Sequence, residues 1–145
     1  MDAERIRGFL LGLPHVVETM QWGANLVFWI GDKAIGGKMF ALANLDGDGR
    51  AVISYAAGAE RYSELLEMEG VIPAPYMARI FWVLVERWDV FRWAGWEQEL
   101  TAAHAITSAK LPPKTRAMLV MPLKEQRKLL RERKALLAAR AAAKG

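Results

Sequence analysis

The apolar side chains from Leu26 onward repeat with the spacing of β-strands, and this pattern constrains the fold more than any other feature. Leu26, Phe28 and Ile30 alternate with their neighbours, which is typical of a strand with one buried face. The pair Gly31-Asp32 then favours a tight turn into a further strand. The pair Gly36-Gly37 inside that strand indicates a β-bulge or a close approach of two backbone segments. We therefore expect a hairpin or a meander of antiparallel strands.

Helical spacing surrounds this block of strands. Near the amino terminus, where Asp2 can cap a helix, Ile6, Phe9 and Leu10 fall on one helical face, and Pro14 ends the segment. The pair Pro112-Pro113 similarly ends a later helix. The fold class predicted is α+β, an antiparallel β-sheet meander flanked by helices, with an appended C-terminal helix. Its further elements are strands over 51–55 and 81–85, the second of them pairing with residues 90–93, and helices over 58–68, 96–111 and 123–144.

The composition excludes several classes of protein. The 145 residues include no cysteine, so disulfides, thiolate metal sites and cysteine nucleophiles are absent. No uncharged apolar run approaches the ~20 residues that a membrane-spanning helix needs. The opening residues, Met1-Asp2-Ala3-Glu4, lack the basic segment that begins a signal peptide. We expect a soluble, cytoplasmic protein that does not associate with membranes.

Positive charge is concentrated in the last quarter of the chain. From Lys110 onward there are eleven basic and two acidic residues, a net charge of +9. Residues 1–109 hold nine basic and fourteen acidic residues, a net charge of −5. Between Leu123 and Lys144 most residues are strong helix formers, and the basic ones recur along one face of a helix about 33 Å long. Such a stripe favours a polyanionic partner, although a solvated helical tail has the same composition.

Candidate metal and catalytic residues are few. The segment from Asn44 to Gly49 has the oxygen spacing of a calcium loop, but Tyr55 stands where the bidentate glutamate belongs, which favours an ordinary turn between strands. His15 and His104 are the only histidines and lie far apart in sequence. No nucleophile, base and orienting partner can be assembled from these residues. We therefore expect no cofactor, no metal and no enzymatic activity.

Four short motifs in order resemble those of the MmcQ/YjbR family. They are Leu13-Pro14-His15-Val16-Val17-Glu18, Phe28-Trp29-Ile30-Gly31-Asp32-Lys33, the segment from Val71 to Trp82, and Lys110-Leu111-Pro112, and the resemblance covers roughly residues 2–120. The family consists of small bacterial α+β proteins with a YjbR/CyaY-like fold, described as DNA-binding modules with a double-wing motif. The resemblance implies a domain over residues 1–121, followed by a basic helical tail over 122–145. The chain departs from the family pattern at Ala78-Arg79 and Ala103-His104.

Three functions follow as hypotheses. The first is nucleic-acid binding, in which β-hairpin wings and late basic residues contact backbone phosphates without catalysis. The second is a small-molecule pocket lined by tryptophans and gated by Pro73-Ala74-Pro75, where Trp82 is expected in the core and Trp29 to be the most exposed tryptophan. The third is dimerisation through Leu123, Leu130 and Leu137 in the tail. The residues predicted to bind nucleic acid are Lys33, Lys38, Arg50, Arg79, Lys110, Lys114, Arg116, Lys124, Arg127, Lys128 and Arg131.

Overall fold

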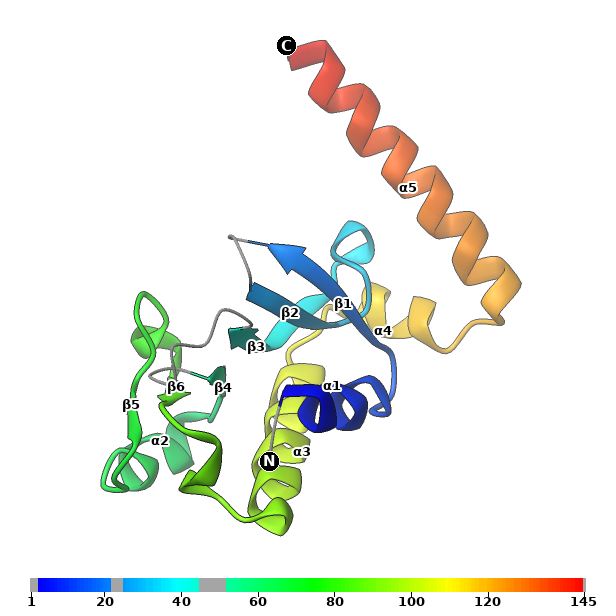
Figure 1. Cartoon of the computed structure of the whole chain (residues 1–145). Helices are drawn as coiled ribbons and strands as arrows, with labels where there is room; N and C mark the ends of the chain where they lie inside the picture. Colours follow the sequence, from blue (N-terminus) through cyan, green and yellow to red (C-terminus); the bar gives the residue numbers. More distant parts are fainter. Residues whose placement is uncertain (1–2, 22–24, 45–51, 145) are drawn as a thin grey trace.

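The computed structural model describes residues 3–21, 25–44 and 52–144. Their strands form a six-stranded antiparallel sheet with the order β1-β2-β3-β4-β6-β5, and the chain ends in a long helix (Figure 1). The predicted α+β class with an antiparallel sheet and a C-terminal helix is therefore confirmed. Some predictions lie outside the described residues, namely those that rest on Asp2, on Arg50 and on the turn between Asn44 and Gly49.

The predicted meander corresponds to β1 (Val16–Gln21), β2 (Asn25–Ile30) and β3 (Lys38–Asn44). The segment between β2 and β3 differs from the prediction, because Lys33–Ile35 forms a 3-10 turn, η1, instead of the start of a strand. The close backbone approach predicted at Gly36-Gly37 is confirmed, since a Cβ on Gly37 would lie 1.9 Å from the carbonyl oxygen of Gly31. The irregular pairing lies further along β3, because Phe28 pairs with Ala41 and Trp29 pairs with Met39, which leaves Phe40 as an extra residue in the β2–β3 ladder.

The other half of the sheet consists of β4 (Ile53–Ala56), β5 (Val71–Pro73) and β6 (Trp82–Val85). The buried strand predicted over 81–85 is confirmed, but its predicted partner is wrong. β6 pairs with β4 on one side and with β5 on the other, so neither of its edges is free for a further strand. Residues 88–90 instead form a 3-10 turn, η3 (Trp88–Val90), that leads into the next helix. The helix predicted over 58–68 is the shorter α2 (Ala59–Leu65).

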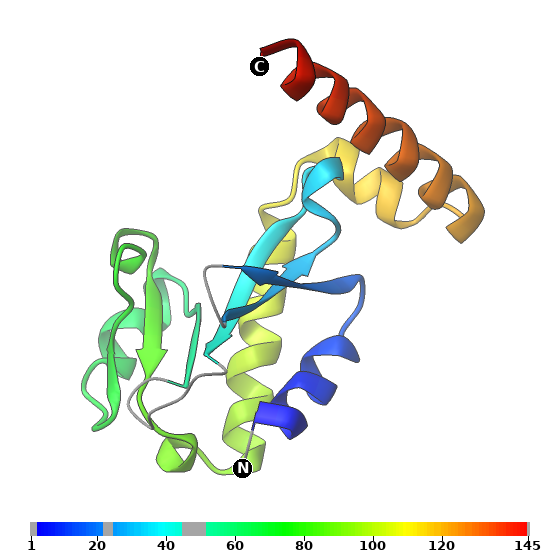
Figure 2. The same ribbon diagram turned by 45° about the horizontal axis from the view of Figure 1, so that its top comes forward.

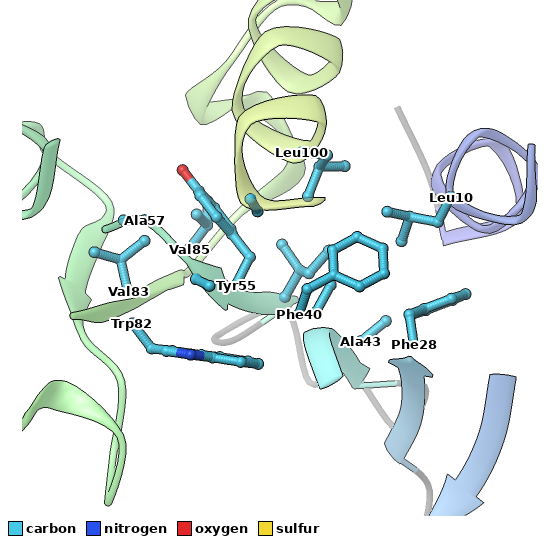
Figure 3. Close-up of a cluster of buried hydrophobic side chains, with 14 of the residues drawn as sticks. Leu10, Phe28, Phe40, Ala43, Tyr55, Ala57, Trp82, Val83, Val85 and Leu100 are labelled. Carbon is cyan, nitrogen blue, oxygen red and sulfur yellow. The ribbon is translucent and has the colours of Figure 1, made fainter. Parts of the chain in front are cut away.

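Two helices, α1 (Ala3–Leu11) and α3 (Trp93–Ala109), pack against one face of the sheet. In Figure 3, Leu10 of α1 and Leu100 of α3 lie near Phe28, Phe40 and Tyr55 of the sheet, whereas Trp82 lies on the opposite side of the strands. All six side chains are buried. Because the two helices occupy this face, any binding site built on the sheet must lie on the other face or at an end.

A buried polar network joins α2 and β4 to α3. The Tyr55 hydroxyl donates a hydrogen bond to Glu99 Oε2 at 3.3 Å, and the Arg61 guanidinium forms an ion pair with the other carboxylate oxygen of Glu99. Burial raises the pKa of Tyr55, and the negative charge of Glu99 raises that pKa further. The network gives the buried carboxylate two partners, as a charge in the core requires.

The last two helices are α4 (Pro113–Leu119) and α5 (Leu123–Lys144). The first turns of α5 are attached to α4, because Gln126 Nε2 donates a hydrogen bond to the carbonyl oxygen of Leu119 at 3.1 Å. Further along, Lys134 Nζ lies 3.2 Å from Asp32 Oδ2, which joins α5 to the η1 turn. Beyond this ion pair the helix extends away from the sheet to the carboxyl terminus (Figures 1 and 2), and its residues 131–144 are exposed.

Candidate functional site

A pocket of about 500 Å³ lies where two central strands diverge. β3 and β4 pair from Ala41 to Ala43 on β3, whereas β3 begins at Lys38 and β4 continues to Ala56. Past this short ladder each of the two strands pairs only with its outer neighbour, β2 or β6, among the described residues. The diverging strand ends form two walls of the pocket, and the carboxyl-terminal end of α3 forms another.

The walls of this fork pocket are mostly apolar. Two tryptophans, Trp29 from β2 and Trp82 from β6, contribute to the lining. Gly58 has a φ of 86° and lies so close to α3 that an added Cβ would be 2.7 Å from Ile106 Cδ1. Glycine at this position therefore lets the chain leave β4 without displacing α3. The remaining lining residues without charge are Gly37, Met39, Ala56, Ile80, Ile106 and Thr107.

Three lysines complete the lining, and no acidic residue is among the lining residues described. Lys33 comes from the η1 turn, Lys38 from the start of β3, and Lys110 from the end of α3. All three were predicted from sequence as nucleic-acid-binding residues, and the fold brings them to one pocket. Their side chains are exposed, so the apolar stems can lie along the walls while the ammonium groups stay in water.

The prediction that Trp29 is the most exposed tryptophan is wrong. Its side chain does point away from the face that contains Phe28 and Ile30, as the alternation indicated, but only 8% of the residue is exposed. The neighbouring strand β1 covers it, since Trp29 Nε1 donates a hydrogen bond to Thr19 Oγ1 at 2.8 Å. Lys33 Nζ lies 6.0 Å from the ring centroid, within the range of a cation–π contact. The prediction for Trp82 is confirmed, because it is buried in the core cluster.

A second hollow, of about 600 Å³, lies on the other side of the η1 turn. We call it the tail groove, because α5 forms one wall through Leu129, Arg133 and Leu136. The turn itself contributes Ile35 and Gly36, and the rest of the lining is Pro112, Lys114, Thr115, Ala117, Met118, Met121 and Glu132. The Thr115 hydroxyl donates a hydrogen bond to the carbonyl oxygen of Ile35 at 2.7 Å, which joins α4 to the turn.

The fork pocket and the tail groove therefore share one turn, and basic residues line both. Lys33, Lys38 and Lys110 line the pocket, while Lys114 and Arg133 line the groove. We call these five residues the basic edge. Sequence analysis did not single out Arg133. Its spacing from Leu129 and Leu136 places the three residues on one face of the helix, and this spacing could have identified it.

The other predicted residues that the structure describes do not join the basic edge. Arg79 is exposed in the 3-10 turn η2 (Ala78–Ile80), where its neighbour Ile80 lines the fork pocket and Arg79 does not. Arg116 is exposed on α4, and Lys124, Arg127, Lys128 and Arg131 are exposed on α5, outside the residues that line either hollow. The leucines predicted to pair two chains, Leu123, Leu130 and Leu137, line neither hollow, and Leu123 and Leu137 are 66% and 41% exposed. Leu129 and Leu136 of the same helix line the tail groove instead.

Among the described residues, the histidines and carboxylates are not arranged as a metal centre. His104 Nε2 lies 2.8 Å from the carbonyl oxygen of Pro14, and its ring packs edge-on against Phe40, which is a structural role. Over residues 3–21, 25–44 and 52–144, no three His, Asp or Glu side chains are grouped so that they could hold a metal ion. In the same part of the chain no helix combines the length and the apolar character needed to cross a bilayer.

Comparisons with known proteins identify relatives by fold and by sequence pattern. The crystal structure of Deinococcus radiodurans protein DR2400, a chain with the domain DUF419, superposes with a TM-score of 0.70. The alignment covers 82% of this chain and 88% of the other, at 23% sequence identity, and so it shows a shared fold. No curated protein matches this chain. The YjbR family model matches residues 11–106, which is more than half of the sequence and includes every strand. The chain therefore belongs to the YjbR family.

Proposed function

We propose that this protein binds nucleic acid, mainly through backbone phosphates. The observation that supports the proposal is the meeting of Lys33, Lys38 and Lys110 around one pocket whose described lining contains no carboxylate. These lysines come from three separate elements, so their proximity is a property of the fold and not of a local run of charge. Lys114 and Arg133 continue the positive charge past the η1 turn.

The physical basis of such binding is the release of counterions from the polyanion. Each phosphate neutralised on a single strand contributes about −0.7 to the slope of log K against log salt concentration. Three lysines therefore predict a slope of about −2, which is roughly a twentyfold loss of affinity between 50 and 200 mM salt. The exposed cations of α5 add further phosphate contacts without sequence preference, because they reach no base edge in a defined geometry.

A charge-matched pair of variants tests the proposal. The triple variant K33A/K38A/K110A removes three charges from the pocket, and R5A/R87A/R92A removes three charges from positions outside both hollows and outside α5. Binding of a fluorescent oligonucleotide, followed by anisotropy at 50 mM salt, should weaken at least about tenfold for the first variant and less than about twofold for the second. Equal losses would mean that net charge alone drives binding. Undetectable binding by the parent protein at this salt concentration would overturn the proposal.

The shape of the fork pocket favours a second candidate, a small planar anion. Its volume of about 500 Å³ lies within the range of ligand pockets, and Trp29 and Trp82 provide aromatic walls. This candidate needs only the pocket, whereas a polynucleotide also contacts Lys114 and Arg133. A mononucleotide that quenches tryptophan fluorescence with the same Kd as a 12-mer would favour the small ligand. A 12-mer that binds much more tightly and with a steeper salt dependence would favour the polynucleotide.

A further inference from the structure

We infer that the fork pocket receives one unpaired nucleobase, so that the protein prefers single-stranded nucleic acid to duplex. This inference rests on the proposed function and specifies its substrate class. In a duplex both faces of each base are stacked, and removing a base from the stack costs free energy before any contact is made. In a single strand the bases are available, and the pocket offers an apolar lining beside lysines that suit the flanking phosphates.

The walls have the character that base stacking requires. The indole of Trp29 lines the pocket with the small part of its surface that is exposed, and its hydrogen bond to Thr19 holds the ring in place, so little side-chain freedom is lost when a ligand packs against it. Ile80 stands on the pocket wall with 55% of its surface exposed, and Ile106 and Met39 add further apolar surface. Every base has an apolar π-face, so this kind of wall accepts any of the four bases.

The lysines are suited to the phosphates on either side of such a base. Lys33, Lys38 and Lys110 are exposed residues with long flexible side chains, and their ammonium groups can reach beyond the apolar walls. Lys33 Nζ lies 6.0 Å from the centroid of the Trp29 ring, at the range of a cation–π contact. A base that enters the pocket would replace this contact, and Lys33 could then bind the phosphate of that base. The pocket therefore combines stacking with charge, which is the pattern of sites that bind single strands without reading sequence.

The experiment compares three ligands of equal length at one salt concentration, namely a single-stranded 12-mer of thymidines, the corresponding duplex, and a 12-mer whose central nucleotides lack bases. We expect the thymidine strand to bind at least tenfold more tightly than either of the other two, with quenching of tryptophan fluorescence. Equal affinity for the thymidine and abasic strands would overturn the inference and leave the proposed function standing. The absence of salt-dependent binding to all three ligands would overturn both.

A matched pair of uncharged substitutions locates the base. Ile80→Asn makes one wall of the pocket polar, and Ile72→Asn changes an isoleucine on β5 that is 40% exposed and outside the pocket. Both side chains are exposed enough for the fold to tolerate the change. We expect Ile80→Asn to weaken thymidine-strand binding about fivefold and to leave abasic-strand binding unchanged, while Ile72→Asn alters neither. Equal effects of Ile80→Asn on both strands, or none on either, would show that no base enters the pocket.

Discussion

The fork pocket and the tail groove lie on opposite sides of the η1 turn, are similar in size, and are built in different ways. Strands β2, β3, β4 and β6 and the end of α3 form the pocket, so the register of the sheet places its lysines. The groove is formed by α4, by the turn, and by α5, which the exposed pair Lys134–Asp32 joins to the turn. The described lining of the groove also contains Glu132 and no aromatic residue. The positions of the lysines in the fork pocket are therefore fixed by the sheet, whereas the position of Arg133 in the tail groove depends on how α5 is attached.

Gly37→Ala should have the largest effect, because it disrupts the turn that both hollows share. The new Cβ would lie 1.9 Å from the carbonyl oxygen of Gly31, and backbone atoms would have to move. We expect a loss of about 3 kcal/mol in the free energy of unfolding, measured by urea denaturation. The control is Gly8→Ala in α1, where nothing lies within 4 Å of the new methyl group. The control should stabilise the protein by about 0.5 to 1 kcal/mol. Similar values for the two variants would contradict the close approach.

The buried network of Tyr55, Glu99 and Arg61 predicts that the fold loses stability at alkaline pH. Burial and Glu99 raise the pKa of Tyr55 in the folded state, whereas the unfolded tyrosine ionises near pH 10. Stability is therefore fully present below about pH 10 and falls above it, because only the unfolded state releases this proton. The expected slope from this residue is about 1.4 kcal/mol per pH unit, measured from urea denaturation between pH 9 and 11.5. Tyr55→Phe should remove this contribution, and an unchanged slope in the variant would contradict it.

Lys134→Ala should have the smallest effect, because it removes an ion pair with two partly exposed side chains. Lys134 and Asp32 are 58% and 29% exposed, so water and salt screen the pair. We expect a loss of at most about 0.5 kcal/mol in the free energy of unfolding, and none at high salt. Limited proteolysis of α5 at low salt should become faster in the variant. If Lys134→Ala lowered the free energy of unfolding as much as Gly37→Ala does, the attachment of α5 to the turn would contribute as much to stability as the close backbone approach at Gly37.

Sequence reasoning worked where one local rule decides the outcome. Alternation at Leu26, Phe28 and Ile30 predicted a strand with one buried face, and the three residues are buried, but Val27 and Trp29 on the other face are buried as well. It failed where the structure of a segment depends on which strand it can pair with. Residues 90–93 were predicted to pair with the strand over 81–85, but both edges of β6 are already paired with β4 and β5. Trp29 is a similar case, because the phase of its side chain follows from local sequence and its burial depends on β1.

The sequence alone indicated the fold class from periodicity and turn residues, the family from four short motifs, and a set of candidate basic residues from charge, because all of these are local properties of the chain. Only the tertiary structure decided that Lys33, Lys38 and Lys110 share one pocket while Arg116, Lys124 and Arg127 do not. The reason is geometric. The pocket exists because β3 and β4 pair over three residues and then diverge, and the register between strands that are distant in sequence depends on the packing of the whole sheet.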